Sequence, residues 1–217
     1  MTRIKVCGIT DEGDALEAVH LGADAVGFDF RKDSPRLIAP REASRIVAKL
    51  PPFLARVGVF ANEAPDQVLN IAEIAGLTVL EFHGEETPEF CRRFPLRWYK
   101  GFRARRGFDP AVLARWACTT YLIESAADDG ADDTGPATWA AAAAAASYGR
   151  VILSGGLTPE NVGEAIAVAR PYAVDASTGI EIVPGKKDID RLEAFIERVR
   201  ETDARLSPWA GVFPDRP

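Results

Sequence analysis

The sequence has few of the side chains that build disulfide frameworks and metal cages. It contains three cysteines and two histidines in 217 residues. The cysteines, Cys7, Cys91 and Cys118, are odd in number and far apart, which fits neither a disulfide framework nor zinc ligation by CxxC pairs. With His20 and His83 as the two histidines, nothing resembles a transition-metal cage. We therefore expect reduced thiols and no metal cofactor.

Long apolar runs and an excess of positive charge are also missing. No segment approaches the roughly 20 apolar residues of a membrane span, and residues 1–5 lead into a strand-like segment instead of a signal sequence. The 26 basic and 32 acidic residues give a formal charge of −6, which argues against a general polyanion binder. We expect a soluble cytoplasmic protein that binds neither membrane nor nucleic acid. The charge still allows a local basic pocket for a small phosphate ester.

The sequence does contain a regular succession of short strand-like runs. Its 47% hydrophobic content is enough for one large domain or two small ones. β-Branched or aromatic runs begin about every 24 residues, which is the length of one compact βα unit. The eight candidate strands are Arg3–Cys7, Ala25–Phe30, Ala55–Phe60, Val79–His83, Arg97–Phe102, Thr120–Ser125, Arg150–Ser154 and Ala173–Ser177.

Segments with helical spacing lie between these runs. The first three cover residues 14–19, 42–47 and 67–72, and the alanine tract Ala140–Ala146 predicts a helix packed closely on the strands. A closing helix is expected from about Asp188 to Asp203. Three further helix starts are indicated by a capping side chain before proline, at Thr87, Asp109 and Thr158.

Eight strands that alternate with helices predict a parallel sheet covered by helices, in the α/β class. Closure into a single (β/α)₈ TIM barrel uses residues 1–205 and leaves 206–217 as a tail, which docks through Trp209 and Phe213 or frays. The rival is a doubly wound open sheet, which usually has a glycine-rich dinucleotide turn after its first strand. Residues 7–10, Cys-Gly-Ile-Thr, are not such a turn.

In such a barrel the reactive groups stand at the carboxyl ends of the strands and in the loops that follow. This rule selects a mixed set of a thiol, cations, carboxylates and glycines, which suits an anionic substrate. The set is Lys5, Cys7, Asp29, Arg36, His83, Glu124, Gly155, Gly156, Asp175, Ser177 and Thr178.

Two glycine-bearing loops at adjacent strand ends indicate a phosphate site. Residues 154–157 and 176–180 would place backbone amides and two hydroxyls together, with a short extra helix at 178–182. We therefore expect Gly155, Gly156, Ser177 and Thr178 to bind phosphate. The alternative is that these glycines only make tight turns.

Three other side chains have two interpretations each. Cys7 is either a buried apolar filler or a catalytic base. As a base it would lie at the mouth of the barrel, the end where the carboxyl ends of the strands meet, and the cation of Lys5 would favour its thiolate. Arg36 is either solvated or positioned to bind a substrate carboxylate through two hydrogen bonds. His83 is either a satisfied buried histidine or a polar group of the site. The residues by themselves do not separate these interpretations.

The same residues fall within a set of ordered motifs that resembles the phosphoribosylanthranilate isomerase family. The resemblance covers nearly the whole chain and is specific as a set. The motifs are Lys5–Thr10, Gly27-Phe28 with Ser34–Arg36, Val57–Phe60, His83–Glu86, Leu153–Val162, Val174–Glu181 and Pro184–Asp188.

The resemblance implies an Amadori rearrangement in the tryptophan pathway without a cofactor. A general acid would open the furanose ring to a Schiff base, and a general base would then remove the C2′ proton. By resemblance Cys7 is the base, and Arg36 holds the anthranilate carboxylate. The loops after strands seven and eight hold the phosphate. We expect Lys5, His83 and Asp175 to contact the substrate as well.

This chain departs from the family pattern at several positions. The acid, an aspartate in the family, is matched by Glu124, which is one methylene longer and so displaces the carboxylate by roughly an ångström. The following loop contains four aspartates within 128–133, of which Asp132 or Asp133 is an alternative acid. Glu81 stands where the family usually has glutamine, and Asp29 also alters the mouth.

These departures leave two alternatives beside the leading prediction of a working phosphoribosylanthranilate isomerase. One is an isomerase that acts on a different phosphoribosyl amine, against which the retained Arg36 argues. The other is a catalytically impaired phosphosugar-binding protein. A small phosphorylated molecule is the expected partner in each case, and the protein would be a monomer or a homodimer.

Overall fold

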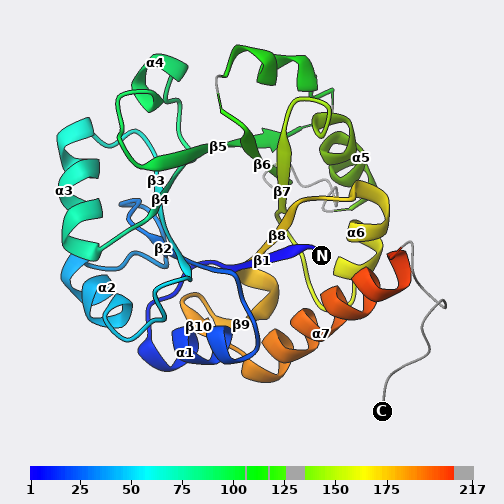
Figure 1. Cartoon of the computed structure of the whole chain (residues 1–217), viewed down its shortest axis with the longest axis horizontal. Coiled ribbons are helices and arrows are strands. Elements are labelled where there is room, and N and C mark those ends of the chain that lie inside the picture. Colours follow the sequence, from blue (N-terminus) through cyan, green and yellow to red (C-terminus); the bar gives the residue numbers. More distant parts are fainter. Residues whose placement is uncertain (106, 117, 126–134, 208–217) are drawn as a thin grey trace.

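The computed structural model describes residues 1–207 except 106, 117 and 126–134. Eight parallel strands close into a barrel in chain order, with β1 paired to both β2 and β8 (Figure 1). This confirms the predicted (β/α)₈ fold. The strands are β1 (Arg3–Val6), β2 (Ala25–Asp29), β3 (Ala55–Phe60), β4 (Val79–Phe82), β5 (Arg97–Ala104), β6 (Thr120–Ser125), β7 (Arg150–Ser154) and β8 (Ala173–Ala176).

All eight strands begin at the predicted residue. Four end one residue earlier than predicted, so that Cys7, Phe30, His83 and Ser177 lie just beyond their strands, and β5 continues to Ala104. Loops at the carboxyl ends of the strands therefore carry Cys7, His83 and Ser177, the positions from which a barrel builds its site.

Helices cover the outside of the barrel (Figure 1). Proline occupies one of the first helical positions in α2, α3, α4 and α5, where its missing N–H costs no hydrogen bond. The helices are α1 (Glu12–His20), α2 (Pro40–Val47), α3 (Pro65–Ala75), α4 (Pro88–Cys91), α5 (Pro136–Ala145), α6 (Val162–Ala169) and α7 (Ile189–Leu206), and a 3₁₀ helix, η1 (Pro110–Arg115), joins β5 to β6.

Two of the three predicted caps are confirmed. Thr87 accepts a hydrogen bond from the amide of Phe90, and Asp109 accepts one from the amide of Ala111. The third was wrong, because α6 begins at Val162. The amide of Thr158 donates to Asn161 Oδ1, and its hydroxyl accepts from the amide of Glu160, so this segment closes as a turn before the helix.

The chain beyond β8 is more structured than predicted. The expected short helix is a 3₁₀ turn, η3 (Thr178–Ile180), followed by a hairpin of β9 (Glu181–Val183) and β10 (Lys186–Lys187). The closing helix α7 is capped by Asp188 and runs to Leu206, three residues beyond the predicted end, because Leu206 on its last turn packs against the core. Trp209, Phe213 and most of the predicted tail lie outside the described residues.

The barrel interior changes from apolar to charged along its axis. An inner layer of Val57, Tyr99, Leu122, Ile152 and Ala173 contacts Ala25 and Val79, the first residues of their strands. At the carboxyl ends the buried side chains include Lys5, Glu81 and Asp175. Because buried charges need partners, this end of the barrel is built for binding or chemistry.

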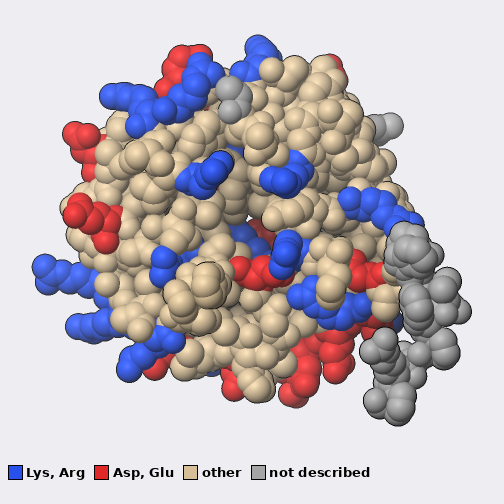
Figure 2. All heavy atoms as spheres, in the orientation of Figure 1, with Lys and Arg blue, Asp and Glu red and all other residues tan. Residues whose placement is uncertain are grey.

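The opposite face, at the amino ends of the strands, is open and basic. Figure 2 shows this face, with Lys and Arg side chains around a central hollow. The hollow has a volume of about 900 Å³, and its lining includes Arg97, Arg150 and Phe53. Phe53 is fully exposed. Among the described helices, none is long and apolar enough to cross a membrane.

Candidate active site

Lys5 is the centre of the charged cluster at the barrel mouth. Its ammonium lies 2.7 Å from Glu81 Oε2 and 2.8 Å from Asp175 Oδ2, and all three side chains are buried. The same nitrogen donates to Cys7 Sγ at 3.3 Å. The ammonium is held by two carboxylates, which raises the pKa of Lys5 well above its usual value even though burial opposes this. The structure thus brings three of the predicted residues, Lys5, Cys7 and Asp175, into one cluster.

Cys7 lies near Lys5 as predicted, but its thiol is not activated in the free protein. Burial raises the pKa of Cys7 to about 12. Lys5 lowers this pKa, and the carboxylates of Asp175, Glu81 and Asp29 add to the effect of burial. Lys5 does favour the thiolate, as expected, but the thiol stays protonated in the unliganded state because burial has a larger effect than Lys5. Two carboxylates already neutralise its charge.

Cys7 has its place because β2 carries a glycine beside it. A Cβ atom on Gly27 would lie 2.7 Å from Cys7 Sγ and 3.0 Å from Lys5 Cε. These separations are shorter than van der Waals contact, so a larger residue here would displace both side chains. The sequence shows glycine at position 27, but only the barrel shows which side chains need the space.

Glu81 connects the Lys5 cluster to His83. Its Oε1 lies 2.9 Å from His83 Nε2, and its Oε2 accepts a 2.5 Å hydrogen bond from the hydroxyl of Tyr99. Burial would raise the pKa of Glu81, but Lys5 and His83 hold it well below its usual range. For His83, burial would lower the pKa, and the contact with Glu81 raises it above the ordinary value. The pair therefore favours carboxylate and imidazolium.

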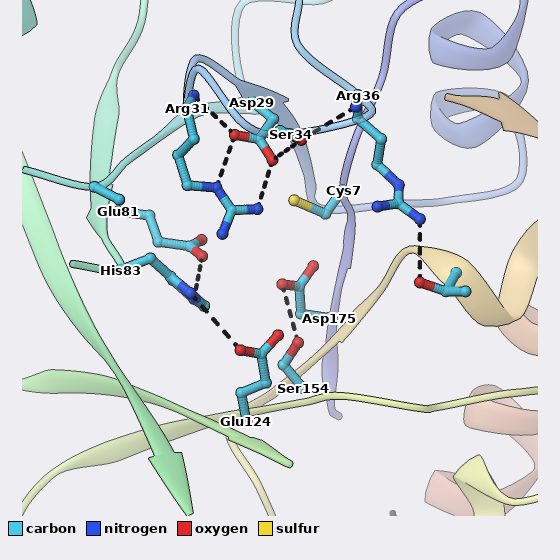
Figure 3. A network of polar contacts seen from close by, with 12 residues as sticks. Cys7, Asp29, Arg31, Ser34, Arg36, Glu81, His83, Glu124, Ser154 and Asp175 are labelled. Atoms are coloured by element: carbon cyan, nitrogen blue, oxygen red, sulfur yellow. Dashed lines mark hydrogen bonds and ion pairs between the residues drawn. The ribbon is translucent and has the colours of Figure 1, made fainter. Parts of the chain in front are cut away.

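Glu124 lies on the other side of the His83 ring. His83 Nδ1 is 3.7 Å from Glu124 Oε2, and Arg103 Nε is 3.8 Å from the same oxygen. The Glu124 side chain is 27% exposed, whereas that of His83 is 7% exposed. Glu124 can therefore reach a bound ligand while it stays next to a buried, charged histidine (Figure 3).

A second carboxylate–arginine pair lies beside Cys7. Arg31 Nε and Nη2 donate to the two oxygens of Asp29 at 2.9 and 2.6 Å, and the hydroxyl of Ser34 also donates to Asp29 (Figure 3). Asp29 was selected by its strand-end position, whereas Arg31 was missed. Its signal was its place two residues after Asp29, in the same loop as Arg36.

Arg36 is held by a network that sequence reasoning did not find. Its guanidinium forms hydrogen bonds of 2.6–3.0 Å with Glu181 and one of 3.1 Å with Thr178 Oγ1. The fully buried ammonium of Lys187 lies 2.7 Å from Glu181 Oε1 and donates to the carbonyl oxygen of Cys7 at 2.6 Å. Glu181 and Lys187 fall within the motifs quoted above, which give no indication that they meet Arg36.

The two loops predicted to bind phosphate differ in their backbone, and the first contains two glycines in the left-handed region. Gly155 and Gly156 have φ angles of +88° and +63°, in the left-handed region that glycine tolerates. A Cβ atom on Gly155 would lie 2.5 Å from the amide nitrogen of Ser125. In the second loop, Ser177 precedes the 3₁₀ turn that contains Thr178. The close approach at Gly155 is to the protein's own backbone, so packing accounts for this glycine, and phosphate binding by the two loops stays a prediction.

One buried oxygen in the mouth has no partner. Asp175 Oδ2 accepts from Lys5 and, at 3.4 Å, from the hydroxyl of Ser154, but Oδ1 has no hydrogen-bond partner among the described residues. A buried oxygen of this kind is an acceptor for a ligand hydroxyl. The acidic loop with Asp132 and Asp133 lies outside the described residues.

The described residues contain no group of three or more His, Cys, Asp or Glu side chains that could hold a metal ion. The mouth instead combines a thiol, a carboxylate beside a histidine, an arginine and two glycine-bearing loops on a closed barrel. The fold and this site define a (β/α)₈-barrel enzyme. The sequence model of N-(5′-phosphoribosyl)anthranilate (PRA) isomerase matches residues 4–198. The chain therefore belongs to the phosphoribosylanthranilate isomerase family, as its motifs predicted.

Individual relatives agree with this assignment. N-(5′-phosphoribosyl)anthranilate isomerase of Trichlorobacter lovleyi is 45% identical over 203 residues, which cover 93% of this chain and 99% of that protein. A solved phosphoribosyl anthranilate isomerase in complex with reduced 1-(o-carboxyphenylamino)-1-deoxyribulose 5-phosphate has a TM-score of 0.82 at 40% identity, covering 93% of this chain and 100% of that one. Monomers generated from the dimeric Thermotoga maritima enzyme have a TM-score of 0.79 at 38% identity, with the same coverage.

Proposed function

We propose that this protein converts N-(5′-phosphoribosyl)anthranilate into 1-(2-carboxyphenylamino)-1-deoxyribulose 5-phosphate, as a step of tryptophan biosynthesis. The observation that carries the proposal is the arrangement of Cys7 and Glu124 around Asp175 in one barrel mouth (Figure 3). Cys7 reaches Asp175 through Lys5, and Ser154, which pairs in register with Glu124, donates to the same carboxylate. The proposed acid, Glu124, and the proposed base, Cys7, therefore lie around one buried carboxylate, which can accept a hydrogen bond from a substrate hydroxyl.

Glu124 is the general acid of the proposed reaction. Its O–H donates a proton to the furanose ring oxygen while the C1′–O4′ bond breaks, and the nitrogen lone pair forms the C1′=N bond of the Schiff base. The extra methylene relative to aspartate carries the carboxylate toward His83 and Arg103, which lie within 3.8 Å. Its partial exposure leaves an oxygen available to the substrate.

Cys7 is the general base. Its thiolate removes the C2′ proton, the C–H electron pair forms C1′=C2′, and the C=N pair returns to nitrogen, which gives an enolamine. The enol then loses its hydroxyl proton and C1′ gains one, which produces the ketone. Because burial and neighbouring carboxylates keep the thiol protonated in the free protein, we infer that the cationic Schiff base favours the thiolate when it forms.

The remaining predicted residues hold the substrate. Arg36, although paired with Glu181, would bind the anthranilate carboxylate, and Gly155, Gly156, Ser177 and Thr178 would bind the phosphate. The unpartnered oxygen of Asp175 supports a contact with a ribose hydroxyl. Lys5 and His83 would act indirectly, through the side chains that they contact, since both are at least nine-tenths buried.

The reaction class follows from the bonds that change. C1′ is reduced from the aldehyde level to a methylene, and C2′ is oxidised from alcohol to ketone within one molecule. We therefore propose an intramolecular oxidoreductase of the aldose–ketose isomerase type, for which no external electron carrier is needed. No step requires a cofactor.

The test is turnover of N-(5′-phosphoribosyl)anthranilate by the purified chain, with chromatographic detection of the ketose product. We expect the wild type to be active and Cys7→Ala to lose roughly 10²–10⁴-fold in kcat/KM, which is the contribution of general-base catalysis. Cys91→Ala is the matched control, because Cys91 is a buried thiol on α4, away from the mouth. An inactive wild type would refute the proposal, and a preference for another phosphoribosyl amine in the same assay would redirect it.

We also propose a cytoplasmic homodimer. The three cysteines are free thiols, which suits a reducing compartment. Phe53 is fully exposed at the edge of the hollow on the face opposite the mouth. An exposed phenylalanine beside a large hollow suits an isologous contact, in which each copy fills the other's hollow.

A further inference from the structure

The carboxylate of Glu81 contacts two charged side chains of the mouth, Lys5 and His83. One of its oxygens contacts Lys5, and the other lies 2.9 Å from His83 Nε2. The second ring nitrogen of His83 lies 3.7 Å from Glu124. Three side chains from β4, the loop after it and β6 therefore form a continuous row, Glu81–His83–Glu124, that ends on the proposed acid (Figure 3).

We propose that His83 is the proton donor that supplies Glu124 with the proton it passes to the sugar, and that Glu81 is the positioning residue that holds His83 as an imidazolium. This inference rests on the proposed isomerase function. It extends that function by assigning a proton source to the first step. The row has the arrangement of a carboxylate–histidine pair, in which the carboxylate fixes the ring and stabilises its charge while the other ring nitrogen exchanges the proton.

The packing around His83 leaves one nitrogen for proton exchange. A Cβ atom on Gly101 of β5 would lie 2.6 Å from both Cδ2 and Nε2 of the ring, so glycine at this position is what admits the imidazole. Nε2 lies 2.9 Å from Glu81 Oε1 as an ion-pair contact, without the alignment of a hydrogen bond. Because the ring is fixed between β4 and β5, Nδ1 faces Glu124. A rotation of the partly exposed Glu124 side chain can shorten the 3.7 Å separation to a hydrogen bond.

Charged groups from three directions act on the imidazole. Glu81 on β4 and Glu124 on β6 favour its protonated form, and Arg31, from the loop after β2, opposes it. From β5, Gly101 contributes no charge, and Arg103 lies near Glu124. The two carboxylates outweigh the arginine and the burial, so the pKa of His83 is raised. The imidazolium is therefore present below this raised pKa and is lost as the pH rises through it.

The proton balance of the step is simple. The His83 Nδ1–H bond breaks and an O–H bond forms on Glu124, which leaves neutral imidazole and a carboxylic acid. Glu124 passes this proton to the ring oxygen of the sugar as the C1′–O4′ bond breaks. Water then returns a proton to His83, while Cys7 releases to solvent the proton that it took from C2′. Glu81 stays a carboxylate throughout, which agrees with its lowered pKa.

The test compares the pH dependence of kcat in the wild type and in Glu81→Gln, which keeps the size of the side chain and removes its charge. Without the carboxylate the pKa of His83 falls, so we expect the alkaline limb of the profile to move at least one pH unit lower. At pH 8 we expect kcat to fall at least tenfold. Glu86→Gln is the matched control, because Glu86 is also a buried carboxylate paired with a lysine, Lys100, but lies outside the row. Its alkaline limb should coincide with that of the wild type.

Two further measurements keep the inference testable if Glu81→Gln folds poorly. In His83→Gln the alkaline limb should disappear while the acid limb stays. By NMR, the imidazole of His83 in the wild type should titrate at least one pH unit above that in Glu81→Gln, with His20→Gln to assign the two histidines. The NMR titration needs no substrate, so it tests the Glu81–His83 pair even if the enzyme assay fails.

The outcomes are distinct. An inactive wild type refutes the proposed function, and the proton-donor role falls with it. If the wild type is active but Glu81→Gln keeps the wild-type alkaline limb, or His83→Gln keeps a full alkaline limb, the proposed donor is wrong. A limb that shifts together with the His83 titration supports it.

Discussion

At the scale of single residues, the protonation state of each side chain in the mouth depends on which charged groups lie next to it. Lys5 is next to Cys7, yet its charge is divided between Glu81 and Asp175, and the thiol stays protonated in the free protein. The pKa of His83 is likewise raised by its neighbours Glu81 and Glu124. A residue's identity therefore sets what it can do, and the neighbour sets which protonation state it starts from.

The length of the Glu124 side chain gives a prediction at this scale. Glu124→Asp withdraws the carboxylate by about one ångström from His83 and from the proposed ring-oxygen position, and such a displacement costs roughly 10²-fold. We expect kcat to fall by ten- to a hundredfold, with KM changed less than threefold, in steady-state kinetics with N-(5′-phosphoribosyl)anthranilate. A rise in kcat would instead show that glutamate impairs the acid. It would favour the alternative of a protein that binds phosphosugars but catalyses poorly.

At the scale of elements, the hairpin of β9 and β10 fixes the loop that carries Arg36. Glu181 on β9 binds Arg36, and Lys187 on β10 binds both Glu181 and the carbonyl oxygen of Cys7. These contacts join residues 145 and 180 positions apart in the chain. The hairpin therefore connects the proposed carboxylate-binding arginine to the backbone of the proposed base.

This connection predicts a pH-dependent contribution to stability. Burial would raise the pKa of Glu181, but Arg36 and Lys187 lower it below the ordinary value of 4.5. A lowered folded-state pKa means that the stabilisation is complete above 4.5 and is lost as the pH falls through the folded pKa. Glu181→Gln should cost roughly 3 kcal/mol at pH 7, since it leaves buried cations unpaired.

Urea unfolding of both proteins at pH 7 and near pH 3 measures this contribution. The difference in unfolding free energy between wild type and Glu181→Gln should be large at pH 7 and at least halved at the lower pH. Other carboxylates titrate in both proteins and cancel in the difference. An equal difference at the two pH values would mean that the Glu181 charge does not stabilise the hairpin.

At the scale of the whole molecule, the barrel separates its two faces. The carboxyl ends of the strands carry the cluster around Lys5, and the amino ends surround the hollow that Phe53 borders. The apolar layer of Val57, Leu122 and Ile152 lies inside the barrel between them. A contact between copies at the amino face can therefore form without covering the mouth.

The proposed homodimer is tested at Phe53. We expect the wild type to have twice the chain mass by light scattering at micromolar concentration. Phe53→Glu should be monomeric, because a buried, unpaired carboxylate disfavours the contact. Phe53→Leu should remain dimeric, and all three proteins should keep turnover within about threefold, since the mouth lies at the other end. A monomeric wild type would contradict the proposal.

The sequence by itself determined the architecture. Strand-like runs and intervening helices define βα units, and the units place strand ends such as Lys5–Cys7 and Gly155-Gly156 at one mouth. The start of each strand was predictable because hydrophobic periodicity is a local property. The absence of a helix cap at Thr158 was not predictable in this way, because the side chain of Asn161 accepts a hydrogen bond from the amide of Thr158 and closes a turn before the helix begins.

Only the tertiary structure decided how the charged groups pair. The partners of Lys5, Glu81 and Asp175, are 76 and 170 positions away in the chain, and Glu181 is 145 positions from Arg36. No local pattern relates residues so far apart. Pairing and burial depend on distances across the closed barrel, and they set the protonation states on which the proposed chemistry depends. The sequence thus located the site and named its residue types, and the closed barrel determined which of them carry protons.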